Sequence, residues 1–383
     1  MTPPWINFRP ELCQADYTLW IQLGEAQAKC EQVASVPLLP SVAEHLHQVF
    51  LARGALATTA IEGNTLTDDD ALKLIKGRLD LPPSKEYLGQ EIRNIVSACN
   101  MIANGVFSDE LTGLTLEGIK DLNTRVLHDL PLKEDVIPGQ IREHDVVVGR
   151  HRGAPPQDCA FLLRKLCSWL NSESFLPDEE RRIASGILKA IVAHLYLAWI
   201  HPFGDGNGRT ARLVEFQLLL SSGVPTAAAH LLSNWYYQTR TEYYRQLDQA
   251  SKSGGDVNPF IRYALQGFKD GLDDLIQTIQ TQQFHVYWIN HVHDIFRDKV
   301  SATDLRRRQL VVDLTEATEP VPIVHLRYIS PRTAEAYAGK KDGTIRRDVS
   351  VLEEMSLVRR SYEGVEINRD LLFTFLSPVT SSG

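Results

Sequence analysis

Residues 201–212 of this 383-residue chain read HPFGDGNGRTAR, and the position of this stretch decides the fold that we predict. Apolar residues recur at three- and four-residue steps over residues 178–200, which predicts a largely buried helix before the stretch. A second apolar helix is expected after it, at about residues 208–222. The stretch is therefore predicted to be a loop between two core helices.

The glycines and arginines of this loop indicate a phosphate-binding site. Gly206 and Gly208 flank Asn207 where the second helix begins, so backbone N–H groups can approach an anion without hindrance from a Cβ atom. Arg209 and Arg212 are three residues apart and share one helix face, which suits consecutive phosphates of a nucleotide.

Two further side chains of the loop suit catalysis. Asp205 lies beside the predicted phosphate site and is suited to hold Mg²⁺ through one carboxylate oxygen. His201 follows a rigid helix and is placed to act as a general base on an incoming hydroxyl. The set predicts transfer from a nucleoside triphosphate to a hydroxyl. The alternative is a glycine-rich turn with unrelated polar residues, and the complete set favours the reactive site.

The loop resembles the signature of Fic-domain proteins, His-x-Phe-x-(Asp/Glu)-Gly-Asn-Gly-Arg-x-x-Arg, at every defined position. The resemblance implies a Fic-type helical core over about residues 95–275. It also implies AMPylation, in which a Ser, Thr or Tyr hydroxyl of a target protein, or of the chain itself, attacks the α-phosphate of ATP. Glycine at position 208 favours this reaction over phosphate transfer, because the related Doc kinases have lysine there.

The same resemblance implies a role for each residue of the loop. His201 is the catalytic base and Asp205 binds Mg²⁺. Arg212 reaches the γ-phosphate of ATP, and the remaining phosphate contacts come from Gly206, Asn207, Gly208 and Arg209.

A second stretch, TTAIEG at residues 58–63, resembles the inhibitory motif (Ser/Thr)-x-x-x-Glu-(Gly/Asn) of the same family. It lies at the end of a helix predicted over residues 41–63. The resemblance implies that Thr58, Glu62 and Gly63 are inhibitory, with Glu62 pairing bidentately with Arg212 in the ATP site. The alternative is a solvated glutamate before a helix-ending glycine. The sequence also leaves open a de-AMPylating or bifunctional enzyme.

Two more segments are expected to contribute to the site. The segment 138–156 contains β-prone residues between glycines and predicts a small hairpin flap, which in Fic proteins holds the target by β-strand addition. Residues 233–247 resemble the adenine-binding segment, which makes Thr239 and Tyr243 expected ATP contacts. Related proteins often have Asn-Arg where this chain has Thr239-Arg240, and Tyr243 and Tyr244 equally suit a core.

The rest of the chain is predicted to be mainly α-helical. We expect an N-terminal helical region over residues 1–94 and a helical linker over residues 276–300. Residues 301–383 read as two short helices and a hairpin and resemble a winged helix-turn-helix. This last region carries twelve basic and twelve acidic residues, so protein docking or dimerisation is favoured over DNA binding.

Composition narrows the class of protein. Hydrophobic residues make up 43% and charged residues 23% of the chain, and the formal charge is −8. The five cysteines have no CxxC spacing, and no secretory signal or long apolar run is found. We expect a cytoplasmic homo-oligomer with reduced thiols, using ATP and Mg²⁺, with no membrane partner. The alternative function is a nucleotide-sensing regulator that binds DNA or a protein, although such a regulator does not require His201.

Overall fold

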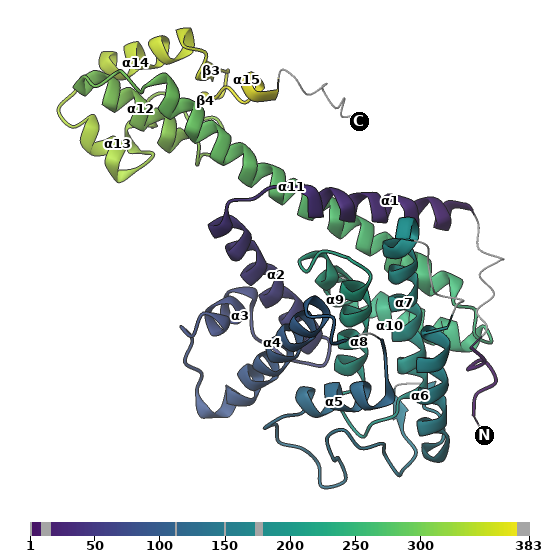
Figure 1. Cartoon of the computed structure of the whole chain (residues 1–383). Helices are drawn as coiled ribbons and strands as arrows, with labels where there is room; N and C mark the ends of the chain where they lie inside the picture. The colour runs from purple at the N-terminus through teal and green to yellow at the C-terminus, as the bar shows by residue number, and fades with distance from the viewer. Residues whose placement is uncertain (1, 9–16, 112, 149–150, 173–178, 374–383) are drawn as a thin grey trace. The chain divides into compact units, whose positions relative to one another are not determined.

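The computed structural model of the protein describes residues 2–8, 17–111, 113–148, 151–172 and 179–373 (Figure 1). In these residues the chain is mainly α-helical, as predicted, with two short antiparallel hairpins. It divides into two compact units, residues 1–277 and residues 278–383.

The first unit is a bundle of helices. In chain order they are α1 (Tyr17–Ser35), α2 (Pro40–Ala60), α3 (Asp68–Ile75), α4 (Glu86–Phe107), α5 (Leu116–Val126), α6 (Pro156–Leu170), α7 (Arg182–Ile200), α8 (Asn207–Ser221), α9 (Leu231–Gln238), α10 (Arg240–Lys252) and the first part of α11 (Asn258–Ile295). Single 3₁₀ turns lie at Pro83–Lys85, Glu179–Arg181 and Ala228–His230.

Helices α7 and α8 pack against each other, and α1, α2, α4, α5 and α6 cover them (Figure 1). The apolar stripe that predicted α7 is buried along most of the helix. Among the described residues, α7 alone is long and apolar enough to cross a membrane, but 78% of that window is buried inside the protein. Its composition is therefore explained by its place in the core. The loop between α7 and α8 is held on both sides by this packing.

The helix that carries the TTAIEG stretch ends earlier than the sequence predicts. Helix α2 stops at Ala60, and residues 61–63 form a turn. Gly63 has a φ of 112°, in the region that favours glycine, and so allows the chain to leave the helix sharply. Helix α2 packs against α3, α4 and α9, and this packing fixes the position of the turn.

The predicted flap contains a very short hairpin. Strands β1 (Val147–Val148) and β2 (His151–Arg152) pair antiparallel, with Val147 opposite Arg152. The two residues that connect them lie outside the described residues. Before this hairpin, Ile141 forms an isolated bridge with Phe203 of the loop between α7 and α8. After it, the Ala154 N–H donates to the carbonyl of Ile200, the last residue of α7.

The second unit has its own core. It contains the end of α11 and then α12 (Ala302–Leu314), a 3₁₀ turn at Leu326–Tyr328, α13 (Pro331–Ala336), α14 (Asp342–Glu354), β3 (Val358–Arg360), β4 (Val365–Ile367) and α15 (Asp370–Phe373). Strands β3 and β4 form a hairpin in which Val358 faces Ile367, and Val321 pairs with Val365 from outside it. The helix–helix–hairpin order agrees with the sequence, and the winged-helix assignment stays a prediction.

The helical segment expected as a linker differs from the prediction. Trp288, Val292 and Phe296 are buried with Leu310, Val349 and other residues of the second unit. They lie four residues apart along the chain, so one face of the helix can pack into that core. Residues 278–296 are therefore structural residues of the second unit.

Reduced thiols were predicted, and the structure describes four of the five cysteines. Cys30, Cys99, Cys159 and Cys167 are buried and form no disulfide. Cys13 lies outside the described residues.

Candidate active site

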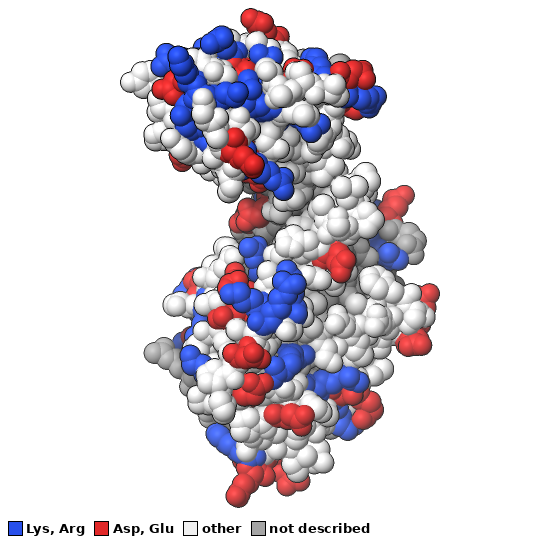
Figure 2. Space-filling view, turned by 90° about the vertical axis from the view of Figure 1, so that its left-hand side faces the viewer, with Lys and Arg blue, Asp and Glu red and all other residues white. Residues whose placement is uncertain are grey.

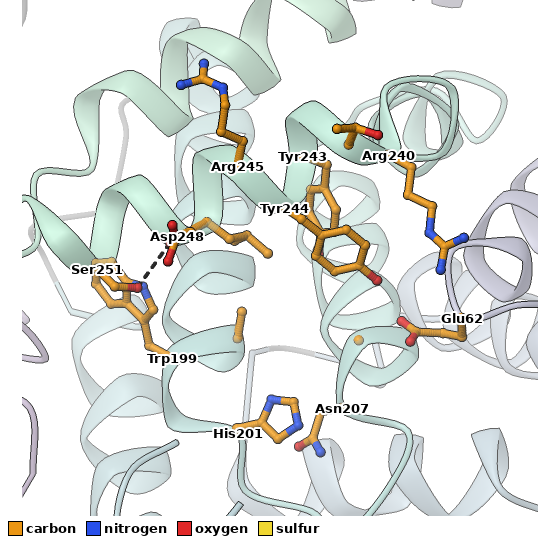
Figure 3. A pocket seen from close by; sticks show the side chains of 14 residues that line it. Glu62, Trp199, His201, Asn207, Arg240, Tyr243, Tyr244, Arg245, Asp248 and Ser251 are labelled. Carbon is orange, nitrogen blue, oxygen red and sulfur yellow. Dashed lines mark hydrogen bonds between the residues drawn. The ribbon is translucent and has the colours of Figure 1, made fainter. Parts of the chain in front are cut away.

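A cavity of about 620 Å³ opens where the α7–α8 loop meets α10. His201, Asn207 and Gly208 line it from the loop, and Glu62 lines it from the turn after α2. Figure 3 shows the His201 imidazole at the base of the cavity and the Glu62 carboxylate reaching in from one side. The opposite wall comes from α10, through Arg240, Thr241, Tyr243, Tyr244, Arg245, Leu247, Asp248 and Ser251.

His201 is held in an uncommon backbone conformation. It terminates α7 with φ 48° and ψ 61°, the left-handed region, and its N–H donates to the Leu197 carbonyl at 2.9 Å. Left-handed geometry is unfavourable for a residue with a Cβ atom, so the surrounding contacts must maintain it. The chain turns sharply at this residue, which directs the imidazole into the cavity rather than along the helix (Figure 3).

Asn207 and Gly206 shape the remainder of the loop. The Asn207 amide bonds both ways to Phe203, accepting from its N–H at 2.9 Å and donating to its carbonyl at 2.8 Å. Gly206 has a φ of 73°, and a Cβ atom there would lie 3.0 Å from the Asn123 amide. Asn207 was predicted to hold phosphates, and in this geometry its side-chain amide closes the loop onto the Phe203 backbone.

The predicted pair of Glu62 and Arg212 is present. A Glu62 Oε1 accepts a hydrogen bond from Arg212 Nη2 at 2.6 Å, and the same nitrogen donates to the Thr58 carbonyl at 2.9 Å. The ion pair is therefore single, whereas the sequence predicted a bidentate one: only Nη2 of Arg212 contacts the Glu62 carboxylate. Thr58 contacts Arg212 through its backbone.

The two side chains of this pair differ in burial, and their burial affects the pKa of Glu62. The Arg212 side chain is 1% exposed and the Glu62 side chain is 34% exposed. Burial on its own would raise the pKa of the Glu62 carboxyl, but the charge and hydrogen bond of Arg212, with Arg209 and His201, lower the pKa overall. Arg212 Nε and Nη1 have no hydrogen-bond partner in the described structure. The buried guanidinium therefore has donors to spare for an anion.

Gly208 provides the space in which this pair forms. A Cβ atom at position 208 would lie 2.2 Å from Glu62 Oε1 and 3.2 Å from both terminal nitrogens of Arg212. Any side chain at this position would have to displace the carboxylate. The glycine that was predicted to admit phosphates here admits the Glu62 carboxylate.

Arg209 and Asp205 form a second charged group beside the loop. Arg209 Nη1 bonds Glu91 Oε1 at 2.8 Å, and its Nη2 bonds Asp205 Oδ1 at 3.1 Å. Burial raises the pKa of Glu91, although the charge of Arg209 and a hydrogen bond from Asn64 oppose this. The Asp205 side chain is half exposed, at 51%. Arg209 is directed toward these acids and away from the cavity.

The two residues predicted to contact adenine have different surroundings. Tyr243 lines the cavity and is 3% exposed, and its hydroxyl is 2.9 Å from His194 Nε2. Thr239 does not line it, because its hydroxyl is engaged by the Trp235 carbonyl and by Tyr263, each at 2.6 Å. Of the predicted site residues, the cavity therefore brings together Glu62, His201, Asn207, Gly208 and Tyr243. Gly206, Arg209, Arg212 and Asp205 lie behind or beside its lining.

The sequence did not predict several residues of the site. Asp248 and Ser251 lie beyond the segment 233–247 that was expected to bind adenine. They have a signal in hindsight, because with Thr241, Tyr244 and Arg245 they recur at three- and four-residue steps and share one helix face. Glu91 and Asn64 gave no such signal, because their partners lie elsewhere in the chain.

Comparison with known proteins identifies a family match within this chain. Residues 113–219 match the Fic/DOC family. A protein adenylyltransferase fic-1 of Caenorhabditis elegans is 30% identical over 229 residues, which cover 60% of this chain and 42% of that protein. A protein adenylyltransferase Fic of Drosophila mojavensis is 32% identical over 216 residues, covering 56% and 39%. The chain thus spans about 40% of the length of these curated relatives.

Solved structures share the fold. The structure of Fic-1 from C. elegans matches with a TM-score of 0.53 and 25% identity, covering 67% of this chain and 71% of that one. A Fic family protein from Desulfovibrio desulfuricans matches with a TM-score of 0.55 and 20% identity, covering 94% and 92%. The chain therefore contains a Fic domain, at residues 113–219, within a helical fold that it shares with Fic-family proteins.

Proposed function

We propose that this protein is a self-inhibited adenylyltransferase that transfers AMP from ATP to a hydroxyl side chain of a target protein or of itself. The observation that carries the proposal is the cavity in which His201, Gly208 and Glu62 meet, with the buried Arg212 behind Glu62. The names of the relatives, protein adenylyltransferase, support the same reaction. The substrate that fits is ATP together with a Ser, Thr or Tyr hydroxyl.

The reaction would proceed by a single displacement. The target hydroxyl oxygen attacks the α-phosphorus of ATP while His201 takes the hydroxyl proton. The bond from the α-phosphorus to the bridging oxygen breaks, and pyrophosphate leaves. The phosphates would lie at the start of α8, near the N–H groups around Asn207 and Gly208.

Magnesium is proposed to accompany the nucleotide, with Asp205 as its protein ligand. The half-exposed Asp205 carboxylate fits a Mg²⁺ ion that is held by one carboxylate, substrate phosphates and water. The described residues contain no group of three or more His, Cys, Asp or Glu side chains placed to hold a metal by themselves. When bound, the ion would neutralise charge on the phosphates of ATP.

Glu62 is proposed to hold the site inactive. Its carboxylate occupies Arg212 and the space above Gly208, which the γ-phosphate would need. ATP that binds with its phosphates displaced would not be aligned for attack, and misalignment lowers rate steeply. The flap hairpin is proposed to receive the target segment by strand addition.

Labelled ATP tests this proposal directly. Wild type, Glu62→Gly and His201→Ala are incubated with ATP labelled on the adenine or the α-phosphate and with Mg²⁺, alone and with cell lysate. We expect protein-bound label to rise at least about tenfold in Glu62→Gly, because Arg212 is released, and to vanish when His201→Ala is added. Glu31→Gly, on the exposed side of α1, is the matched control and should resemble wild type.

The outcomes separate the alternatives. Label that never appears in any variant contradicts AMP transfer and favours a nucleotide-sensing regulator. Label that is lost from a pre-modified chain with wild type, but not with Glu62→Gly, identifies a de-AMPylating or bifunctional enzyme.

A second candidate function concerns the second unit, which we propose binds the phosphate backbone of DNA. Its net charge is near zero, but some of its acids are paired with arginines: Asp342 pairs with Arg327, and the buried Asp348 bonds Arg306 and Arg307. Five exposed cations form no ion pair in the described structure: Arg332, Lys340, Lys341, Arg346 and Arg347. Figure 2 shows many Lys and Arg side chains on this unit, in the upper part of the view, with Asp and Glu side chains among them. This arrangement favours DNA more than the charge count in the sequence does.

A further inference from the structure

Arg142 is a buried arginine whose partners are three backbone carbonyls and, at 3.7 Å, the Cys159 sulfur. It lies just before the flap and is 4% exposed. Its Nε donates to the His201 carbonyl at 2.8 Å, its Nη1 donates to the His144 carbonyl at 2.5 Å, and its Nη2 donates to the Ala154 carbonyl. Within the described residues, no Asp or Glu forms an ion pair with it. A buried cation must be stabilised by hydrogen bonds, and here backbone carbonyls supply them in place of a carboxylate. This arrangement indicates that the side chain holds backbone segments in position.

The backbone repeats the same connections. The Arg142 N–H donates to the Pro202 carbonyl at 3.0 Å, and the Ala154 N–H donates to the Ile200 carbonyl at 3.2 Å. The chain entering the flap and the chain leaving it are thus both bonded to residues 200–202. The Arg142 guanidinium joins these two chains to each other and to His201.

This guanidinium lies where the end of α7 needs donors. The last carbonyls of a helix have no intrahelical partner, and a positive charge near them is favourable. His201 itself has left-handed backbone angles, which a residue with a Cβ atom rarely adopts unaided. A hydrogen bond from Arg142 to the His201 carbonyl opposes rotation of that peptide unit. The orientation of the imidazole in the cavity depends on the same backbone angles.

We propose that Arg142 is a positioning residue that fixes the His201 imidazole and ties the flap to it. The proposal rests on AMP transfer by His201, as set out above. A target segment paired with the flap would then have a fixed position relative to the His201 backbone. The same set of hydrogen bonds would position both the target hydroxyl and the imidazole. Arg142 touches neither ATP nor the hydroxyl and would act through His201.

The test compares substitutions of Arg142 in the Glu62→Gly background, where transfer is measurable. Arg142→Met removes all donors, and Arg142→Lys retains the charge but cannot reach three carbonyls together. We expect Arg142→Met to lower kcat for labelled AMP transfer by about 100-fold, because a small displacement of a catalytic group has effects of this size. The Kd for ATP should change less than about threefold.

A second variant guards against simple unfolding. Gly153→Ala retains the arginine at position 142 but crowds it. The added methyl would lie 3.0 Å from Arg142 Nη2 and 3.1 Å from His201 Cβ. It should reproduce the selective loss of kcat. The matched control is Arg182→Met at the other end of α7, where Arg182 Nε also donates to a carbonyl, that of Ser222, at 3.2 Å. This control should keep kcat.

Nuclear magnetic resonance of the histidine rings gives a readout that does not depend on activity. In folded Arg142→Met the His201 ring resonances should shift and broaden, while those of the buried His230 remain unchanged. Unchanged His201 resonances, or loss of ATP binding in parallel with kcat, would overturn the positioning role. If AMP transfer itself is wrong, the Glu62→Gly parent shows no label, and the resonances still decide whether Arg142 positions His201.

Discussion

The contact between Glu62 and Arg212 depends on the missing side chain at position 208. Gly208→Ala would place a methyl 2.2 Å from the Glu62 carboxylate, so one of the two must move. We expect a stability loss of about 1–3 kcal/mol, typical of overpacking, and a clearly smaller loss when Glu62 is already glycine. Denaturant unfolding of the four chains of this double-mutant cycle measures the difference. Equal losses in the two backgrounds would show that the methyl does not meet the carboxylate.

The lowered pKa of Glu62 sets the pH dependence of inhibition. A carboxyl whose folded pKa lies below its ordinary value adds stability above the ordinary pKa and loses it as pH falls through the folded pKa. The pair with Arg212 should therefore remain intact at neutral pH. We expect the ratio of label transfer between Glu62→Gly and wild type to be the same at about pH 6 and about pH 8. A ratio that collapses at the lower of these values would contradict the assignment.

At the scale of helices, the position of the inhibitory turn depends on α4 as much as on α2. The buried Asn64 donates to the Leu88 carbonyl and to the Glu91 carboxylate, each at 2.9 Å, directly after Gly63. We expect Asn64→Ala to cost about 1–3 kcal/mol of stability, since it leaves buried groups unpaired, and to raise AMP transfer part of the way toward Glu62→Gly. Urea unfolding and labelled transfer measure the two effects. Asn104→Ala, on an exposed face of α4, should change neither.

Local patterns predicted these helices well and their mutual contacts poorly. The apolar stripe of α7 and the glycines of residues 204–208 are local patterns that span only a few residues. Both the helices and the loop were therefore predictable from the sequence. The Glu62–Arg212 pair, 150 residues apart, was predictable only because both halves resemble known motifs. Asn64, Glu91 and Arg142 belong to no such motif, and their partners are mostly backbone carbonyls or distant charges, which leave no periodic pattern in a sequence.

At the scale of the whole molecule, each of the two units should unfold on its own core. Trp288 is fully buried in the second unit, so Trp288→Ala should destabilise that unit by roughly 3–5 kcal/mol. The first unit and its cavity should keep their stability. Calorimetry should then resolve an earlier transition for the second unit, with ATP binding unchanged. Tyr287→Ala, which changes an exposed neighbour, serves as control. A single transition that moves as a whole would refute independent cores.

The DNA proposal for the second unit makes a prediction about salt. Phosphate contacts release counterions, so affinity for a random-sequence duplex should fall steeply as salt rises. Replacing both Arg346 and Arg347 by alanine should weaken binding and reduce the salt slope by roughly two. Fluorescence anisotropy measures both, with Arg297→Ala, whose guanidinium pairs with Asp294, as control. Binding to an acidic protein, with none to the duplex, would point instead to a protein-docking surface.

The unsatisfied donors of Arg212 have a consequence for how variants of this protein are selected. A desolvated guanidinium with unused donors destabilises the native state, and Glu62 offsets part of this destabilisation by neutralising its charge. Removing Glu62 would therefore yield a chain that is both more active and less tolerant of heat. A screen for thermostability would enrich silent enzymes, and a screen for activity would enrich fragile ones, unless a phosphate compound were present to occupy the arginine.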